Sequence, residues 1–146
     1  MRYVFSTIGA LFLLFSISLS AAELTVHITG VDEAKAGNIM VGVYDSEATF
    51  LKDDARIAEA SVPITDAKEG LIKVPFNLQV SKTYAVAAYH DTNGNEELDK
   101  NFFGIPKEGY GFSNNARSTF GPPSFEKAAF QLILEKNQMV SFYLSY

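Results

Sequence analysis

The sequence predicts an all-β fold, a seven-stranded antiparallel sandwich of the immunoglobulin or transthyretin type with one long ordered aromatic loop. Hydrophobic residues recur at every second position in seven short runs, which is the period of a strand with one buried face. Breaks rich in Gly, Pro, Asn, Asp or Lys separate the runs, as turns separate the strands of a sandwich. The repeat of two residues argues against a helical domain.

Seven strands follow from this pattern: residues 24–28, 39–44, 62–64, 72–76, 84–88, 130–134 and 140–146. Pro75 has no N–H to donate, so its strand is expected at the edge of a sheet. Residues 135–138 (EKNQ) predict the tight turn of a final hairpin. Residues 45–51 follow a strand with a capping residue and early acids, and they predict one or two helical turns that close an end of the sandwich.

Residues 1–22 predict a signal peptide. A positive start, Met1-Arg2, precedes the mostly apolar residues 4–19, and Ser20-Ala21-Ala22 places small residues before a cut ahead of Glu23. A transmembrane anchor is the alternative, but the run is rather short and no basic residue follows it. The chain has no Cys to carry a lipid. We therefore expect a periplasmic or secreted protein whose residues 23–146 form a single β-sandwich domain.

The charge of the mature chain is acidic. Arg2 leaves with the leader, so 11 of the 12 basic residues face 17 acidic ones and the net charge is −6. This balance argues against nucleic acid or an anionic membrane surface as partner, and we expect no membrane insertion after the leader is cleaved. Without cysteine there is no disulfide, so the hydrophobic core must hold the fold in an oxidising compartment.

A long segment between Asp91 and about Glu126 shows no convincing strand. Six aromatic residues lie in it among glycines and prolines: Phe102, Phe103, Tyr110, Phe112, Phe120 and Phe125. Such a loop is either a compact unit with its own small core or a ligand-binding lid. We expect a local core for most of the aromatics, with Tyr110 and Phe112 as the exceptions. The candidate ligand-binding residues are Tyr110, Phe112, Asn114, Asn115 and Arg117.

The start of this loop, DTNGNEELD, predicts a weak calcium site. Calcium takes six to eight oxygen ligands from a loop that curls around it. Residues that can offer an oxygen ligand recur at alternate positions, and the candidate ligands are Asp91, Asn93, Asn95, Glu97 and Asp99. Glu97 would bind through its backbone carbonyl and the others through their side chains. The loop is not an EF-hand, because its Gly stands at position four and Phe102 at position twelve. Zinc is disfavoured because no Cys and no second His lie near His90.

A metal-free polar turn is the alternative. Asn93-Gly94 is a favoured pair in type I′ hairpin turns. A hairpin also needs alternating apolar residues on both sides, and residues 96–101 do not supply them. The spacing therefore favours calcium over the turn.

The segment AAYHDTNGNEELDKNFFGIPKEGYGFSNNARSTFGPPSFEKAAF resembles the hallmark stretch of an uncharacterised bacterial family, the domain of unknown function 2141. Residues 82–86 and 41–46 fit the same family, and with the leader and the final strands the resemblance covers essentially the whole chain. It implies a small exported all-β protein and no particular activity. The Asp-x-Asn-x-Asn-x-x-x-Asp run also resembles calcium loops in B-type repeats of bacterial surface adhesins, which carries over to Asp91, Asn93, Asn95 and Asp99.

We expect a binding or structural module and not an enzyme. The chain has no Cys nucleophile and no Gly-x-Ser-x-Gly elbow, and His90 and Asp91 point to opposite faces of their strand. The expected partner is a protein or a glycan recognised by the aromatic loop. The alternative is a periplasmic enzyme that acts on a small molecule or glycan through the same loop.

Overall fold

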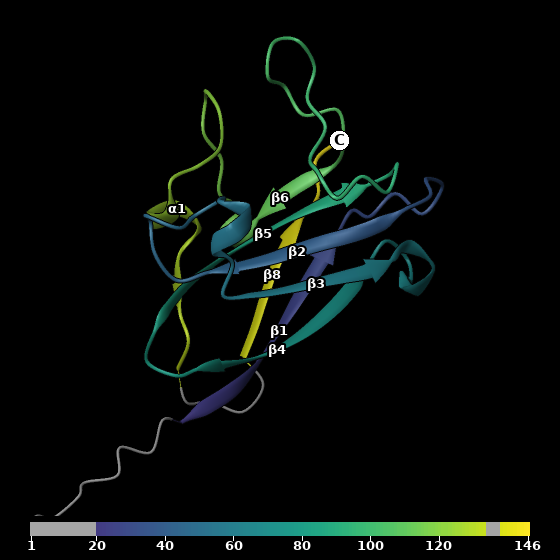
Figure 1. The fold of residues 1–146 in the computed structure, drawn as a ribbon. Coiled ribbons are helices and arrows are strands. Elements are labelled where there is room, and N and C mark those ends of the chain that lie inside the picture. The colour runs from purple at the N-terminus through teal and green to yellow at the C-terminus, as the bar shows by residue number, and fades with distance from the viewer. Residues whose placement is uncertain (1–19, 134–137) are drawn as a thin grey trace, which may run out of the picture.

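The computed structural model describes residues 20–133 and 138–146, and it is an all-β sandwich of two sheets (Figure 1). One sheet has three strands in the order β4-β1-β8. The other has the order β3-β2-β5-β6, with β7 also paired to β5. The predicted fold class is confirmed, although the described residues form eight strands, one more than the sequence predicts.

The three-stranded sheet is built around β1 (Ala21–Thr29). β4 (Ile72–Gln79) pairs with it antiparallel and places Pro75 opposite Thr25 at the edge of the sheet, as predicted. β8 (Gln138–Tyr143) pairs with the other side of β1, and this pairing is parallel. The expectation of a wholly antiparallel sandwich is therefore wrong for β8.

The second sheet is antiparallel. β2 (Asn38–Tyr44) lies between β3 (Ala58–Pro63) and β5 (Thr83–Asp91). β6 (Tyr110–Phe112) and β7 (Phe130–Gln131) occupy successive stretches of the far side of β5. Because β7 joins this sheet and β8 joins the other, the chain crosses between sheets and the predicted final hairpin is wrong. Residues 135–137 of its expected turn lie outside the described residues.

The core lies between the two sheets, and the residues with a two-residue period fill it. Its buried side chains alternate along β1, β4 and β8 with exposed or half-exposed ones, whereas β2 and β5 also contain consecutive buried residues. The core side chains include Leu24, Val26, Ile28, Ile39, Val41, Val43, Ile72, Val74, Phe76, Leu78, Tyr84, Val86, Val140, Phe142 and Leu144. Each such side chain contributes roughly 1.5–3 kcal/mol of burial free energy, which is how a chain without disulfides holds together.

Residues 45–51 form a hydrogen-bonded turn and not the predicted helical turns. The Phe50 N–H donates to the Ser46 carbonyl at 3.0 Å, but Leu51 has a positive φ of 62° and ends the run. A short 3₁₀ helix, η1 (Asp53–Ala55), follows, and a second, η2 (Ile64–Asp66), comes after β3. The Phe50 ring packs edge-on against Tyr44 at 5.4 Å, so the turn covers that end of β2.

The segment after Asp91 contains more regular structure than the sequence predicts. β6 is followed by the 3₁₀ helix η3 (Ser113–Asn115) and the short helix α1 (Phe125–Ala128). β6 escapes sequence analysis because its central residue is Gly111. A side chain there would come within 2.4 Å of the Tyr143 carbonyl oxygen, so only glycine lets the end of β8 cross so closely.

Residues 1–19 of the predicted leader lie outside the described part. Ala22 lies in β1 opposite Leu78, so a cut before Glu23 would leave β1 starting at Glu23. In the part of the chain that the structure describes, no helix has the length and apolar character needed to cross a membrane.

Candidate functional site

The loop 92–109 leaves the end of β5 and is organised by the buried carboxylate of Asp91, which is 1% exposed. One oxygen, Oδ1, accepts the backbone N–H groups of Gly94 at 2.8 Å and Asn95 at 3.3 Å. The other, Oδ2, accepts the N–H of Glu96 at 3.0 Å. Three convergent donors stabilise the charged carboxylate and curl the chain around it. Gly94 and Glu96 both take positive φ angles in this curl.

Asn93, Asn95 and Asp99 face one another in the next layer of the loop. The Asn93 side-chain amide donates to Asp99 Oδ2 at 2.6 Å, and that of Asn95 donates to Asp99 Oδ1 at 3.3 Å. The two asparagine oxygens accept the N–H groups of Asn95 at 3.1 Å and Glu97 at 3.0 Å. Each amide oxygen keeps a second lone pair, so both could still bind a cation.

The structure thus brings three of the five predicted metal ligands into side-chain contact, Asn93, Asn95 and Asp99, whereas the Asp91 carboxylate binds backbone N–H groups of the same loop. The Glu97 side chain is exposed, in keeping with the role predicted for its backbone carbonyl only. Within residues 20–133 and 138–146, no three His, Cys, Asp or Glu side chains converge as a metal-binding group. A cation in this loop would therefore depend on amide and carbonyl oxygens, which are weaker ligands for calcium than carboxylates.

Glu108 is a buried acid in this loop that sequence analysis missed. It is 4% exposed, and its Oε1 accepts the backbone N–H of Thr92 at 2.8 Å and the Thr92 hydroxyl at 2.9 Å. Its Oε2 accepts the N–H of Asp99 at 3.1 Å. Glu108 therefore connects Thr92, at the start of the loop 92–109, with Asp99; this loop is called the polar loop below. The position of Glu108 two residues before β6 is the only local signal of this role, and the sequence does not predict β6.

Two tyrosines fix the edges of the loop. The Tyr89 hydroxyl donates to the Glu96 carbonyl at 2.6 Å, and burial raises the Tyr89 pKa to about 12. His90 is fully buried: its Nε2 donates to the Ala36 carbonyl at 3.0 Å, so its Nδ1 accepts the Tyr146 hydroxyl at 2.7 Å. Burial also raises the Tyr146 pKa. These contacts make His90 a structural residue that holds the last residue of the chain.

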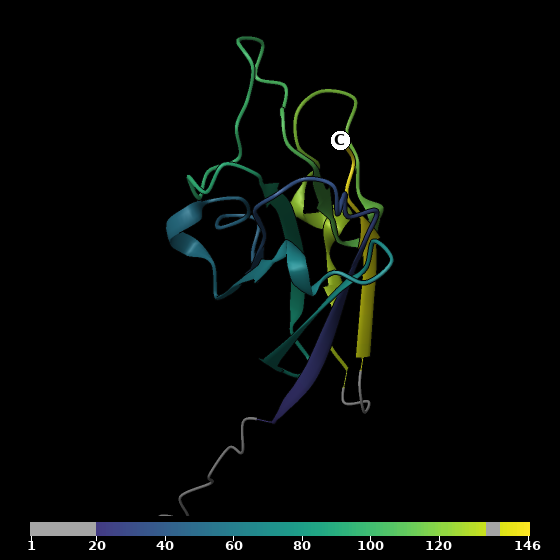
Figure 2. The ribbon, with the colours of Figure 1, turned by 90° about the vertical axis from the view of Figure 1, so that its right-hand side faces the viewer.

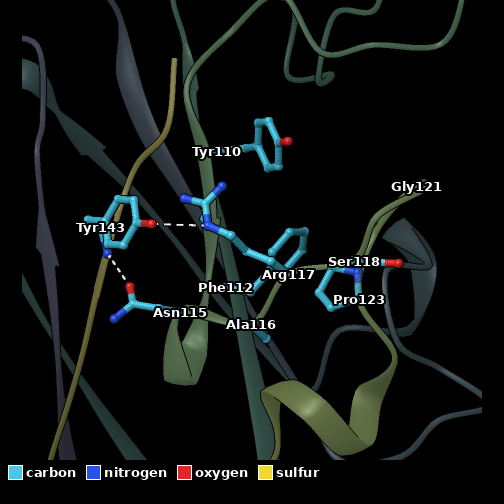
Figure 3. A pocket seen from close by; sticks show the side chains of 10 residues that line it. Tyr110, Phe112, Asn115, Ala116, Arg117, Ser118, Gly121, Pro123 and Tyr143 are labelled. Atoms are coloured by element: carbon cyan, nitrogen blue, oxygen red, sulfur yellow. Dashed lines mark hydrogen bonds between the residues drawn. The ribbon is translucent and has the colours of Figure 1, made fainter.

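A partly open pocket lies beside β6 and the loop after η3 (Figure 3). Four of the five predicted ligand-binding residues line it: Tyr110, Phe112, Asn115 and Arg117. Figure 3 shows the Arg117 guanidinium group directed toward Tyr143, where its Nε donates to the hydroxyl at 3.0 Å and its charge lies 4.7 Å from the ring centre. The pocket combines aromatic faces with one cation, which suits a planar or anionic ligand.

Asn114, the fifth predicted ligand-binding residue, does not line the pocket. Its side-chain amide donates to the Ala129 carbonyl at 2.8 Å and to the Lys127 carbonyl at 3.3 Å. The buried Ser113 hydroxyl accepts the Val86 N–H at 2.9 Å and donates to the Ala128 carbonyl at 2.6 Å. These residues therefore attach α1 to β5 and serve the fold.

The expected distribution of the loop aromatics is wrong. Phe112 and Phe125 pack with Phe50, at ring distances of 6.3 Å and 5.8 Å, and Tyr110 packs on Phe112 at 5.9 Å. Phe102, Phe103 and Phe120 are instead 97%, 83% and 90% exposed. The two residues expected to be exceptions are thus among the more buried, because β6 draws them onto the sheet.

The fold and these sites define a two-sheet β-sandwich with a long, hydrogen-bonded polar loop at the end of one strand. The chain belongs to the family described as uncharacterized protein conserved in bacteria (DUF2141), whose model matches residues 26–141. The match covers at least part of every strand, the whole loop 92–109 and all the pocket residues except Tyr143. Neither the curated proteins nor the solved structures include a match to the chain.

Proposed function

We propose that this protein is an exported, non-catalytic binding module that calcium stabilises at the loop 91–99 and that recognises a protein or glycan beside β6. The observation that carries the proposal is the contact of the Asn93 and Asn95 side chains with Asp99, in a loop whose backbone curls around the Asp91 carboxylate. Residues 1–22 support export, because they have the charge and hydropathy pattern of a cleaved leader.

The loop fits calcium better than magnesium or zinc. All of its candidate ligand atoms are oxygens, which calcium prefers. Magnesium requires a tight octahedron and retains its waters, and zinc prefers thiolate and imidazole ligands. The oxygens come from two carboxylates and several amide or carbonyl groups, so the dissociation constant should be about 10⁻⁴–10⁻³ M, the range of extracellular modules.

The pocket supplies the recognition surface of the proposal. Arg117 brings a positive charge to a wall formed by Tyr110, Phe112 and Tyr143. Aromatic faces stack on sugar rings and on aromatic side chains, and a guanidinium group pairs with a carboxylate. An acidic glycan or peptide therefore fits this surface.

The alternative, an enzyme that uses the same loop, has less support. The buried polar and charged groups of the described residues are His90, Asp91, Glu108 and Ser113. All four form the structural hydrogen bonds given above, and no buried side-chain nitrogen or oxygen in the described residues lacks a partner. Catalytic groups usually need a free, reactive atom that faces a substrate.

Titration calorimetry tests the calcium part of the proposal. The unmutated protein should bind one calcium per chain with a dissociation constant of about 10⁻⁴–10⁻³ M. Asp99→Ala should abolish binding, whereas Glu96→Ala should leave it unchanged, because the exposed Glu96 offers the loop only its backbone. Absence of heat with the unmutated protein, or equal binding by Asp99→Ala, would refute the site.

A further inference from the structure

Two loops carry exposed phenylalanines on the same side of the molecule. In Figures 1 and 2, the loop before β6 and the loop after η3 both extend past the β6 edge of the sheet. The first has Phe102, Phe103 and Ile105 at its end, exposed by 97%, 83% and 59%, and the second has Phe120, exposed by 90%. We name these four residues the apolar tips. Exposed apolar side chains that group together on an ordered protein mark a surface that binds a partner or a membrane.

The first tip is an ordered turn. The Asn101 side-chain oxygen accepts the N–H groups of Phe103 at 2.9 Å and Ile105 at 3.0 Å. The Asn101 N–H donates to the Ile105 carbonyl at 2.8 Å, and the Lys107 N–H donates to the Asp99 carbonyl at 2.8 Å. The turn is therefore closed by its own hydrogen bonds while its phenylalanines face outward.

The second tip is closed in a similar way. The Ser118 hydroxyl donates to the Phe120 carbonyl at 3.1 Å, and Gly121 takes the positive φ of 72° that the turn requires. Both turns use their polar groups internally and present apolar rings to the outside. A folded chain gains nothing from this arrangement by itself, since the exposed rings lose the free energy of burial.

The net charge of −6 disfavours an anionic surface for the chain as a whole, but the charge at the tips has the opposite sign. Residues 100–107 (KNFFGIPK) contain two lysines and no acid, and residues 116–123 (ARSTFGPP) contain one arginine and no acid. The mature chain without these two segments is strongly acidic. Basic side chains beside exposed aromatic rings suit the boundary between anionic headgroups and acyl chains, where the rings enter the apolar layer and the charges stay at the headgroups.

We propose that the apolar tips dock the protein on the surface of an anionic phospholipid bilayer. The tips project from the molecule, so they fit a deformable surface better than they fit a flat protein face. Phe102, Phe103 and Ile105 have no hydrogen-bonding side-chain atoms, so they supply none of the directional contacts by which a protein partner is selected. Insertion of apolar side chains into a bilayer requires no such directional contacts. This docking is peripheral, goes beyond the proposed function and does not depend on calcium.

The test is cosedimentation of the protein, exported with its own leader and purified, with vesicles of phosphatidylethanolamine and phosphatidylglycerol. We expect binding that weakens at high salt and with phosphatidylcholine alone, because part of the attraction is electrostatic. The double change Phe102→Ser and Phe103→Ser should lower the partition coefficient about tenfold or more, and Phe120→Ser should lower it about threefold. Melting curves of these variants should match the unmutated protein.

Matched controls separate the tips from general stickiness. Ile57 is 45% exposed next to β3, at the opposite edge of the sheet, and Met139 is 57% exposed on β8. Ile57→Ser and Met139→Ser should leave vesicle binding unchanged. Absence of vesicle binding by the unmutated protein, or equal loss in the controls, would overturn the proposal. So would a dimer in vesicle-free solution that disappears in the tip variants, since a second copy would then be the occupant.

The same measurement in chelator and in excess calcium keeps the two proposals apart. Vesicle binding should persist in chelator, because the first turn meets the calcium loop through the Asp99 backbone carbonyl, which is not one of the proposed calcium ligands. If the protein binds vesicles in chelator but calorimetry detects no heat of calcium binding, the calcium site alone is refuted. Calcium binding without docking would refute the tips alone.

Discussion

At the scale of single residues, Glu108 is the side chain on which the polar loop depends most. One buried carboxylate accepts three hydrogen bonds from Thr92 and Asp99, which lie at the two ends of the candidate calcium loop. Hydrogen bonds to a charged acceptor are stronger than neutral ones, and the donors would be left without partners if the acceptor were removed.

Glu108→Ala should lower the free energy of unfolding by about 1.5–3 kcal/mol, because buried N–H groups lose a charged acceptor. Urea denaturation measures this change if the slope of the free energy of unfolding against urea concentration is the same for the variant and the unmutated protein. Glu47→Ala is the matched control: Glu47 is exposed in the turn after β2, so its loss should stay within about 0.5 kcal/mol. Equal midpoints for the two variants would show that Glu108 does not brace the loop.

Residue-scale patterns were predictable where they are local. The alternation of oxygen-bearing side chains in DTNGNEELD predicts a loop that curls, and in the structure the side chains of Asn93, Asn95 and Asp99 meet. Glu108 lies nine residues beyond Asp99 and meets it only after the chain has turned back. The role of Asn114 was not predictable either. Its partners Lys127 and Ala129 lie in and directly after α1, a helix that the sequence does not predict.

At the scale of elements, the contrast between β6 and the loop tips is the main feature. Both are rich in aromatic residues, but β6 lies on a sheet and the tips project from it. Phe112 contacts Phe50 and Tyr110, whereas Phe102, among the aromatic rings of the described residues, contacts only its neighbour Phe103.

Phe112→Ala should lower the free energy of unfolding by about 1.5–3 kcal/mol, since it removes apolar burial and two ring contacts. Phe102→Ala should change the free energy of unfolding by less than about 0.5 kcal/mol. The Phe102 ring is already exposed to water in the folded chain, so unfolding does not change its surroundings much. Urea midpoints of the two variants decide the matter. A large loss for Phe102, or none for Phe112, would reverse the assignment of core and surface.

Strands with a clear alternation were predictable, and pairings between distant strands were not. The period of two residues places β1, β2, β4 and β5 near their observed bounds, and in β1 and β4 it follows from burial of one face. β6 has three residues with Gly at its centre, so it carries no such pattern. The parallel pairing of β8 with β1 depends on the crossover of the chain, which the alternation within β8 does not encode.

At the scale of the whole molecule, the two sheets form a rigid base and the loops around β6 carry the candidate functions. Gly109 and Gly111 let the C-terminal segment approach the chain at β6 closely, and Gly37 lets the segment before β2 approach the end of β5. A side chain at Gly109 would lie 2.4 Å from the Tyr146 ring, and one at Gly37 would lie 1.9 Å from the Asp91 carbonyl. The polar loop is thus held between its own hydrogen bonds and closely approaching segments, so a bound cation would stabilise the folded chain as a whole.

The melting temperature in chelator and in about 10 mM calcium tests the central claim of a calcium-stabilised module most directly. For a dissociation constant of about 10⁻⁴–10⁻³ M, calcium should add roughly 1.4–2.7 kcal/mol to the free energy of unfolding. A domain of this length should then melt roughly 4–12 °C higher in calcium, and much less so in magnesium. Asp91→Ala and Asp99→Ala should each lose the shift, and Glu96→Ala should keep it. Identical melting curves of the unmutated protein in chelator and in calcium would contradict the account.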